Sequence, residues 1–196
     1  IYNWSRHELW RTPMKITDEI RIEASREKVF AALNDPEILR RAIPGCQELD
    51  QTSDTELTAT VQAKVGPVKA TFRGAVTLSD VNPPESYIIS GEGKGGAAGF
   101  AKGKAKVSLV GDGSATILSY EVDAEVGGKL AQVGGRLIEG TSKKLAGDFF
   151  ETFSAIVNSS NPTLEKTAPA SATSEPMLLW VEAALIALIL LVSFAN

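Results

Sequence analysis

The sequence predicts an α+β fold in which an antiparallel sheet packs on one long amphipathic helix. Residues 57–126 mostly alternate apolar with polar residues, in runs separated by short turns, which is typical of half-buried strands. Residues 127–157 instead place apolar residues at three-, four- or eight-residue spacing, as on one face of a helix. Strands joined by short turns pair antiparallel, and a sheet with one apolar face is stable when a helix covers that face.

The first elements are a strand and two short helices. Residues 16–23 alternate, with isoleucines on one side, and predict the first strand. Ser25 and Asp35 are good helix N-caps, and Pro36 stands at the first helical position after the second cap. Two short helices are therefore expected between residues 26 and 42.

The sheet continues with strands of period two. Residues 57–65 and 68–79 form a hairpin around a Gly-Pro turn, a further strand begins at Tyr87, and residues 101–109 and 118–126 follow, for about six strands. The last two strands carry polar stripes of opposite charge: Lys102, Lys104 and Lys106 on one, and Glu121, Asp123 and Glu125 on the other. A hairpin register would set the lysines opposite the acids, so the basic stripe does not require an anionic partner.

Gly91, Gly93 and Gly96 match the G-x-G-x-x-G spacing of a dinucleotide-binding loop. That loop needs a helix directly after the glycines, whose N-terminus meets the pyrophosphate, whereas the residues that follow alternate as a strand. The segment is therefore interpreted as a glycine-rich connection between strands. Together with Phe100 it is a candidate lip of a cavity.

Glycines also interrupt the long helix, at Gly134, Gly135, Gly140 and Gly147, although each costs about 1 kcal/mol relative to alanine. Either they allow close packing on the sheet, or they leave room for a ligand. Many inward-facing strand residues are also small, and no cluster of polar residues faces inward, which favours a cavity for an apolar ligand. The residues expected to line it are Phe72, Val76, Phe100, Leu130, Val133, Leu137, Phe149 and Phe153.

Composition excludes several functions. The net charge of -4 argues against nucleic acid as the partner. The only cysteine is Cys46 and the only histidine is His7, so an intramolecular disulfide, a histidine-based triad and a zinc site are excluded. Without a histidine to activate it, Cys46 is expected to be a small core residue. The candidate acid–base groups Tyr87, Tyr120, Glu139 and Asp148 do not obviously converge, so no catalytic residue and no metal is predicted and the chain is expected not to be an enzyme.

Both ends differ from this domain, which is predicted to span residues 14–158. Residues 1–13 show no period and are interpreted as a leader or artificial extension, and residues 159–176 are a disordered linker rich in Ser, Thr, Pro and Ala. Residues 177–196 are apolar except for Glu182, and as a helix of about 28 Å they would span a membrane as a tail anchor. An interfacial or dimerisation helix is the alternative. Anchor residues are Leu178, Trp180, Leu185, Ile189, Leu191 and Phe194.

Several strings resemble the CoxG family of carbon monoxide dehydrogenase subunits, part of the START-like helix-grip superfamily, over residues 14 to about 157. They are EIRIEASREKVFAALNDPEILRRAIPGCQEL, KVGPVKATFRGAVTLSDVNPPESY, GEGKGGAAGFAKGKAKVSL and GGKLAQVGGRLIEGTSKKLAGDFFETF. The resemblance implies a seven-stranded sheet gripping the C-terminal helix around an apolar tunnel. It also implies a role in attaching molybdenum-containing carbon monoxide dehydrogenases to the membrane and in handling a quinone.

The leading hypothesis combines these expectations. It is a tail-anchored accessory protein on the cytoplasmic face of the inner membrane, which binds an isoprenoid quinone or lipid and recruits a carbon monoxide dehydrogenase-like molybdenum hydroxylase. No covalent or metal cofactor is expected. A START-like cyclase or hydrolase and a ligand-free membrane adaptor are the alternatives.

Overall fold

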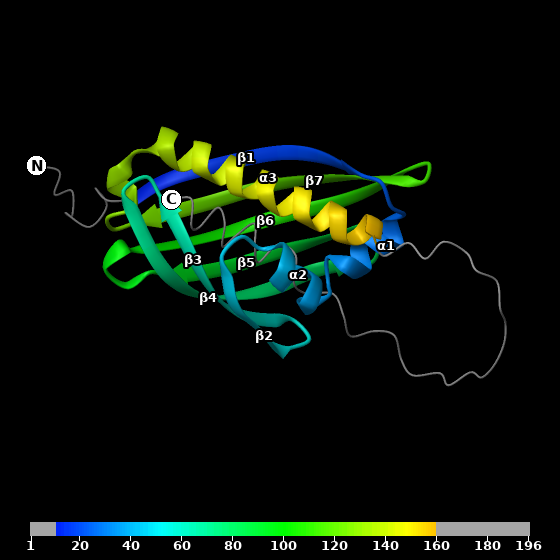
Figure 1. The fold of residues 1–196 in the computed structure, drawn as a ribbon, viewed down its shortest axis with the longest axis horizontal. Coiled ribbons are helices and arrows are strands. Elements are labelled where there is room, and N and C mark those ends of the chain that lie inside the picture. The colour runs from blue at the N-terminus through cyan, green and yellow to red at the C-terminus, as the bar shows by residue number, and fades with distance from the viewer. Residues whose placement is uncertain (1–10, 160–196) are drawn as a thin grey trace, which may run out of the picture.

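A seven-stranded antiparallel sheet and one long helix form the two main layers of the fold (Figure 1). This is a computed structural model, and it describes residues 11–159. The strand order is β1-β7-β6-β5-β4-β3-β2. The strands are β1 (Arg11–Ile22), β2 (Cys46–Ser53), β3 (Glu56–Val65), β4 (Val68–Asn82), β5 (Ser86–Lys94), β6 (Phe100–Asp112) and β7 (Ala115–Gly127). The α+β class and the seven-stranded antiparallel sheet implied by the resemblance are confirmed.

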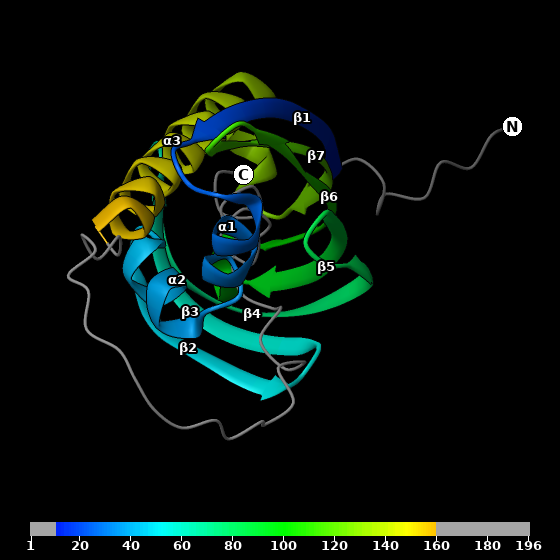
Figure 2. The same cartoon turned by 90° about the vertical axis from the view of Figure 1, so that its right-hand side faces the viewer.

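The sheet curls around the long helix α3 (Gly135–Ser159), as the end-on view shows (Figure 2). α3 lies over the open side of the curl, where it contacts β1 and β3. The short helices α1 (Arg26–Ala32) and α2 (Pro36–Ala42) cover one end of the curl and also pack on α3. The interior is therefore enclosed by the sheet and by all three helices.

The predicted caps of the short helices are confirmed. The Ser25 hydroxyl accepts a hydrogen bond from the Lys28 amide at 3.4 Å, and Asp35 accepts from the Glu37 amide at 2.9 Å. These side chains satisfy amide groups that have no partner within the helix. The two caps fix where α1 and α2 begin, and thus how they close the end of the sheet.

The long helix begins eight residues later than the pattern predicted. β7 continues to Gly127, and a short 3₁₀ turn, η2 (Ala131–Val133), precedes α3. The helix face differs as well, because Leu137 is 44% exposed while Ile138 is completely buried. The buried residues of α3 are Ile138, Ser142, Ala146, Phe149, Phe150, Phe153, Ile156 and Val157.

The predicted pairing of the two charged stripes is confirmed. Residues of β6 and β7 pair in the register Lys102↔Glu125, Lys104↔Asp123 and Lys106↔Glu121. In the first of these pairs, the Lys102 Nζ lies 3.2 Å from Glu125 Oε2. The charges on the outer face of these strands therefore largely balance one another.

The glycine-rich connection is shorter than expected, because β5 extends to Lys94 and β6 starts at Phe100. A strand, not a helix, follows the glycines, which agrees with the argument against a dinucleotide site. A Cβ on Gly95 would lie 2.2 Å from the ring of Phe72, so only glycine leaves room for that ring. Packing accounts for this part of the connection.

Two boundaries concern the ends of the chain. β1 begins at Arg11, three residues before the expected start of the domain, and pairs there with Gly127 of β7. The predicted linker (159–176) lies outside the described residues except for Ser159, which ends α3, and the predicted anchor (177–196) lies wholly outside them. Among residues 11–159, no helix has the length and apolar content needed to cross a membrane.

Candidate functional site

The candidate site is the enclosed interior between the sheet and the helices. Of the residues expected to line it, five are at most 1% exposed: Phe72, Val76, Leu130, Phe149 and Phe153. Phe100 and Val133 are only partly buried. Leu137 is exposed on the other side of α3, so it does not face the interior as predicted.

Aromatic rings occupy the part of the interior beneath α3. The ring centroids of Phe149 and Phe153 are 5.7 Å apart, those of Phe149 and Phe150 are 4.9 Å apart, and Phe150 stacks on Tyr120 at 5.7 Å. Such contacts add to the free energy gained by burying the rings. Phe150 was not predicted, because it follows Phe149 directly and both rings belong to the buried face of the helix.

The glycines of α3 do not contribute space to this interior. Gly140 and Gly147 are exposed, and a Cβ on either would meet no atom within 4 Å. Both explanations considered for them, close packing on the sheet and room for a ligand, are therefore wrong for these two positions. Gly134 and Gly135 are also exposed, and Gly134 precedes the helix.

Two polar atoms in the interior have no hydrogen-bond partner among the described residues. They are the Tyr87 hydroxyl and the Asn34 Oδ1, in side chains that are 1% and 2% exposed. Both belong to the surroundings of Phe30: the Phe30 and Tyr87 rings meet edge to face at 5.8 Å, and the Asn34 amide nitrogen donates to the Phe30 carbonyl. Burial raises the pKa of Tyr87 well above its usual range, so its hydroxyl remains a neutral donor.

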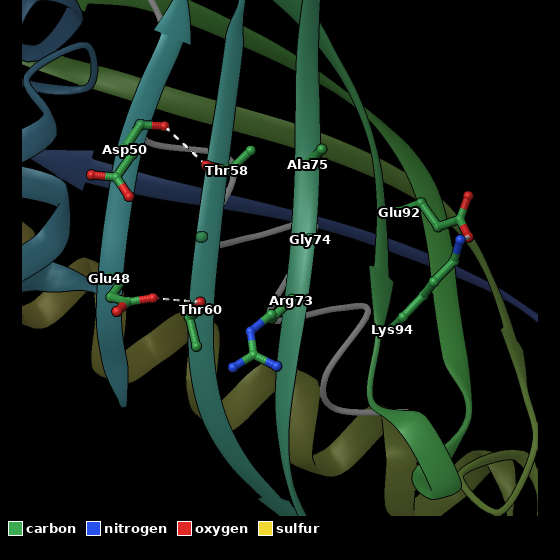
Figure 3. Close-up of a pocket in the computed structure, with 10 residues that line it drawn as sticks. Glu48, Asp50, Thr58, Thr60, Arg73, Gly74, Ala75, Glu92 and Lys94 are labelled. Atoms are coloured by element: carbon green, nitrogen blue, oxygen red, sulfur yellow. Dashed lines mark hydrogen bonds and ion pairs between the residues drawn. The ribbon is translucent and has the colours of Figure 1, made fainter.

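A separate hollow of about 530 Å³ lies on the outer face of the sheet, over β2 to β5 (Figure 3). The side chains drawn there project on the side of the sheet away from α3. The Thr60 hydroxyl donates to Glu48 at 3.0 Å, and Lys94 pairs with Glu92 at 3.2 Å. Sequence reasoning did not single out this hollow, because it depends on the curvature of the sheet. Its lining mixes both charges, which gives it no single electrostatic preference.

Phe100 contributes to another surface hollow, of about 500 Å³, beside the glycine-rich connection. Gly96, Gly99 and Lys102 also line it. The partly buried ring of Phe100 thus lies between the interior and the surface, where we expected the lip of a cavity. Whether this lip opens is a prediction that the structure does not test.

The candidate acid–base groups do not come together. Glu139 pairs with Lys143 at 2.8 Å and Asp148 with Lys144 at 2.6 Å, both on the solvent side of α3. Tyr120 faces inward, and burial together with the Asp18 carboxylate raises its pKa. Among the described residues, no group of three or more potential metal ligands is present.

Cys46 shows the features of a structural thiol. It is half-buried, its Sγ donates to the Glu48 carbonyl at 3.5 Å, and burial raises its pKa. A raised pKa keeps the thiol protonated and therefore weakly nucleophilic. This environment agrees with the interpretation of Cys46 as a small packed residue.

The sequence model of the CoxG family, a subunit family of carbon monoxide dehydrogenase, matches residues 19–158. The chain belongs to this family. A conserved protein from Geobacillus kaustophilus has a similar structure, with a TM-score of 0.71 and 30% identity over 75% of this chain and 97% of that chain. No curated protein sequence matches the chain.

More distant structures share the fold of this CoxG-family domain. A START superfamily protein from Mycobacterium smegmatis has a TM-score of 0.56 and 16% identity, over 74% of this chain and 97% of that chain. The Zhui aromatase/cyclase from Streptomyces sp. R1128 has a TM-score of 0.55 and 12% identity, over 75% and 94%. At these identities the likeness shows the START-like fold alone, which accommodates an enzyme as well as other proteins.

Proposed function

We propose that this CoxG-family chain is a membrane-tethered accessory protein. It binds an apolar molecule, an isoprenoid quinone or a lipid, in the interior of the START-like domain, and it recruits a molybdenum-containing carbon monoxide dehydrogenase to the membrane. Family membership supports the accessory role. The apolar stretch at residues 177–196 supports the tether.

The observation that carries the ligand-binding part is the pair of unpartnered polar atoms on Tyr87 and Asn34. An unpaired buried polar group costs roughly 1–3 kcal/mol, so a folded protein usually provides a partner for it. A ligand oxygen that accepts from the Tyr87 hydroxyl would supply one, and a ligand hydroxyl could donate to Asn34 Oδ1. The rest of the interior is apolar, as a ligand with a hydrocarbon body would require.

A ligand-free adaptor is the second candidate, and the aromatic cluster favours it. The rings of Phe149, Phe150 and Phe153 already contact one another, so a bulky ligand would have to displace side chains. The two candidates differ in what the purified protein contains. Organic extraction and native mass spectrometry of full-length protein from membranes should recover a quinone or lipid at about one per chain. A domain that is ligand-free and takes up no added quinone would contradict the carrier role.

The tether is tested by removing residues 177–196. We expect the shortened chain to move from the membrane fraction to the soluble fraction, because the remaining linker lacks an apolar stretch. Quantitative blotting of the two fractions measures the shift. An unchanged distribution would contradict the anchor without bearing on ligand binding.

Replacing Tyr87 with Phe should have opposite effects on the free and the ligand-bound protein. Without ligand, the variant should be more stable by about 1–3 kcal/mol, because an unpartnered buried hydroxyl is removed. Affinity for an added quinone should fall by roughly tenfold or more, for loss of the only interaction the hydroxyl makes. Denaturant unfolding and fluorescence titration measure the two quantities.

Tyr120→Phe is the matched control for this pair of effects. The Tyr120 hydroxyl interacts with Asp18, so its loss should destabilise the free protein by about 1 kcal/mol, opposite in sign to Tyr87→Phe. Equal destabilisation by both variants would mean that Tyr87 already has a partner in the free protein.

A further inference from the structure

The two ends of the sheet carry opposite charge. At the left end in Figure 1, the segments 64–69, 94–100 and 127–137 contain basic residues and no Asp or Glu. The turns at the other end, in segments 22–27, 52–56, 79–86 and 110–115, carry Glu23, Glu27, Asp54, Glu56, Asp80, Glu85 and Asp112, with Arg26 as their only cation. A chain with a net charge of -4 thus presents one wholly basic end.

We define the basic end as Lys64, Lys69, Lys129 and Arg136 together with Leu137. All five side chains are exposed, and none of the four cations forms an ion pair with a described residue. Leu137 is 44% exposed, and a Cβ on Gly66 would lie 2.6 Å from its Cδ2 atom. The start of α3 and the tip of the β3–β4 hairpin are therefore in contact, which places an exposed leucine among cations.

Stability of the domain does not explain this arrangement. Lys64 and Lys69 face each other directly in the β3–β4 register, and like charges in that position repel. Arg136 lies in the first turn of α3, where the helix dipole favours an acid. An anionic partner would turn these unfavourable positions into favourable ones.

We propose that the basic end docks on the surface of an anionic lipid bilayer. Cations supply attraction to the headgroups, and an apolar side chain among them inserts at the boundary with the acyl chains. The chain outside the described residues argues for a bilayer over an acidic protein, because a polar linker there leads to the apolar stretch at 177–196. The inference rests on the proposed tether, which would hold the domain near a membrane while the basic end sets its orientation.

The test uses a chain ending at Ser159, which lacks the apolar stretch. This part contains the whole sheet and α3, and the similar protein from Geobacillus kaustophilus corresponds to it over 97% of its own chain, so it is expected to fold alone. It is mixed with vesicles of phosphatidylcholine alone, or with added phosphatidylglycerol, and sedimented. We expect binding only to the anionic vesicles, and loss of binding at about 1 M salt, where the Debye length is about 3 Å.

Substitutions identify the surface responsible. Lys64→Gln with Lys69→Gln should weaken binding to the anionic vesicles roughly 20-fold, at about 1 kcal/mol per basic residue. The matched control, Lys104→Gln with Lys106→Gln, removes the same charge from the outer face of β6 and should leave binding unchanged. Leu137→Ser should weaken binding severalfold without altering its dependence on salt.

Equal weakening by both lysine pairs would overturn the proposal, since it would show attraction by net charge alone. Absence of any preference for anionic vesicles would overturn it as well, and would leave an acidic protein surface as the partner of this end. Neither result depends on the tail, whose role is measured separately by fractionation of the full chain.

Discussion

Replacement of Phe149 by alanine is expected to destabilise the domain by about 3–5 kcal/mol. Phe149 is completely buried and contacts Phe150 and Phe153 at ring-centroid distances of 4.9 and 5.7 Å, so its removal would leave a cavity bounded by two rings. For a domain of this size, the loss corresponds to a fall in Tm of roughly 10 °C. Denaturant unfolding at equilibrium, monitored by circular dichroism, measures it.

Leu137→Ala is the control on the same helix. Leu137 is 44% exposed, so its truncation should change the free energy of unfolding by no more than about 0.5 kcal/mol. The comparison also bears on ligand binding. A loss for Phe149→Ala as small as that of the control would mean that Phe149 borders a space already open in solution, which would favour a preformed cavity over a packed interior.

The strands could be predicted from the sequence because their period and turns act locally. Alternation over Leu57–Val65 and Val68–Ser79 fixes which side chains face inward, and the turn between them fixes the register. The same logic correctly placed Lys102 opposite Glu125. β2 was not delimited, because its alternation is weak and Leu49 is its one buried residue.

The long helix shows why the rest could not be predicted in the same way. Leu130, Val133 and Leu137 fit a helical spacing, but the chain from Gly128 to Gly134 is a connection containing a 3₁₀ turn, so the phase of the helix is set from Gly135 onward. In that phase Ile138 faces the sheet and Leu137 faces solvent. Periodicity alone cannot detect a change of backbone conformation within a glycine-rich segment.

The residues important for function depend still more on tertiary structure. Nothing in the sequence near Tyr87 or Asn34 indicates an unpartnered polar atom, since that property depends on what α1 and β5 bring together. The basic end likewise combines three segments distant in the sequence. Only the antiparallel order of the strands shows that they lie at one end of the sheet.

Gly99→Ala is expected to destabilise the domain by about 3 kcal/mol or more. The φ angle of Gly99 is +118°, a region that residues with a Cβ rarely adopt, and an added Cβ would lie 2.0 Å from the Gly127 carbonyl oxygen. The backbone on both sides would have to move apart. Because the Leu130 amide donates to the Ala98 carbonyl at 3.0 Å, that movement would also disturb the segment leading into α3.

Gly96→Ala separates the two causes of this loss. Gly96 also has a positive φ, of +58°, but an added Cβ would meet no atom within 4 Å, so only the backbone term of about 1–2 kcal/mol is expected. The difference between the two variants in denaturant unfolding measures the cost of the contact with Gly127. If the two losses were equal, the connection would not be held against β7, and the glycine-rich segment beside Phe100 would be free to act as the mobile lip considered above.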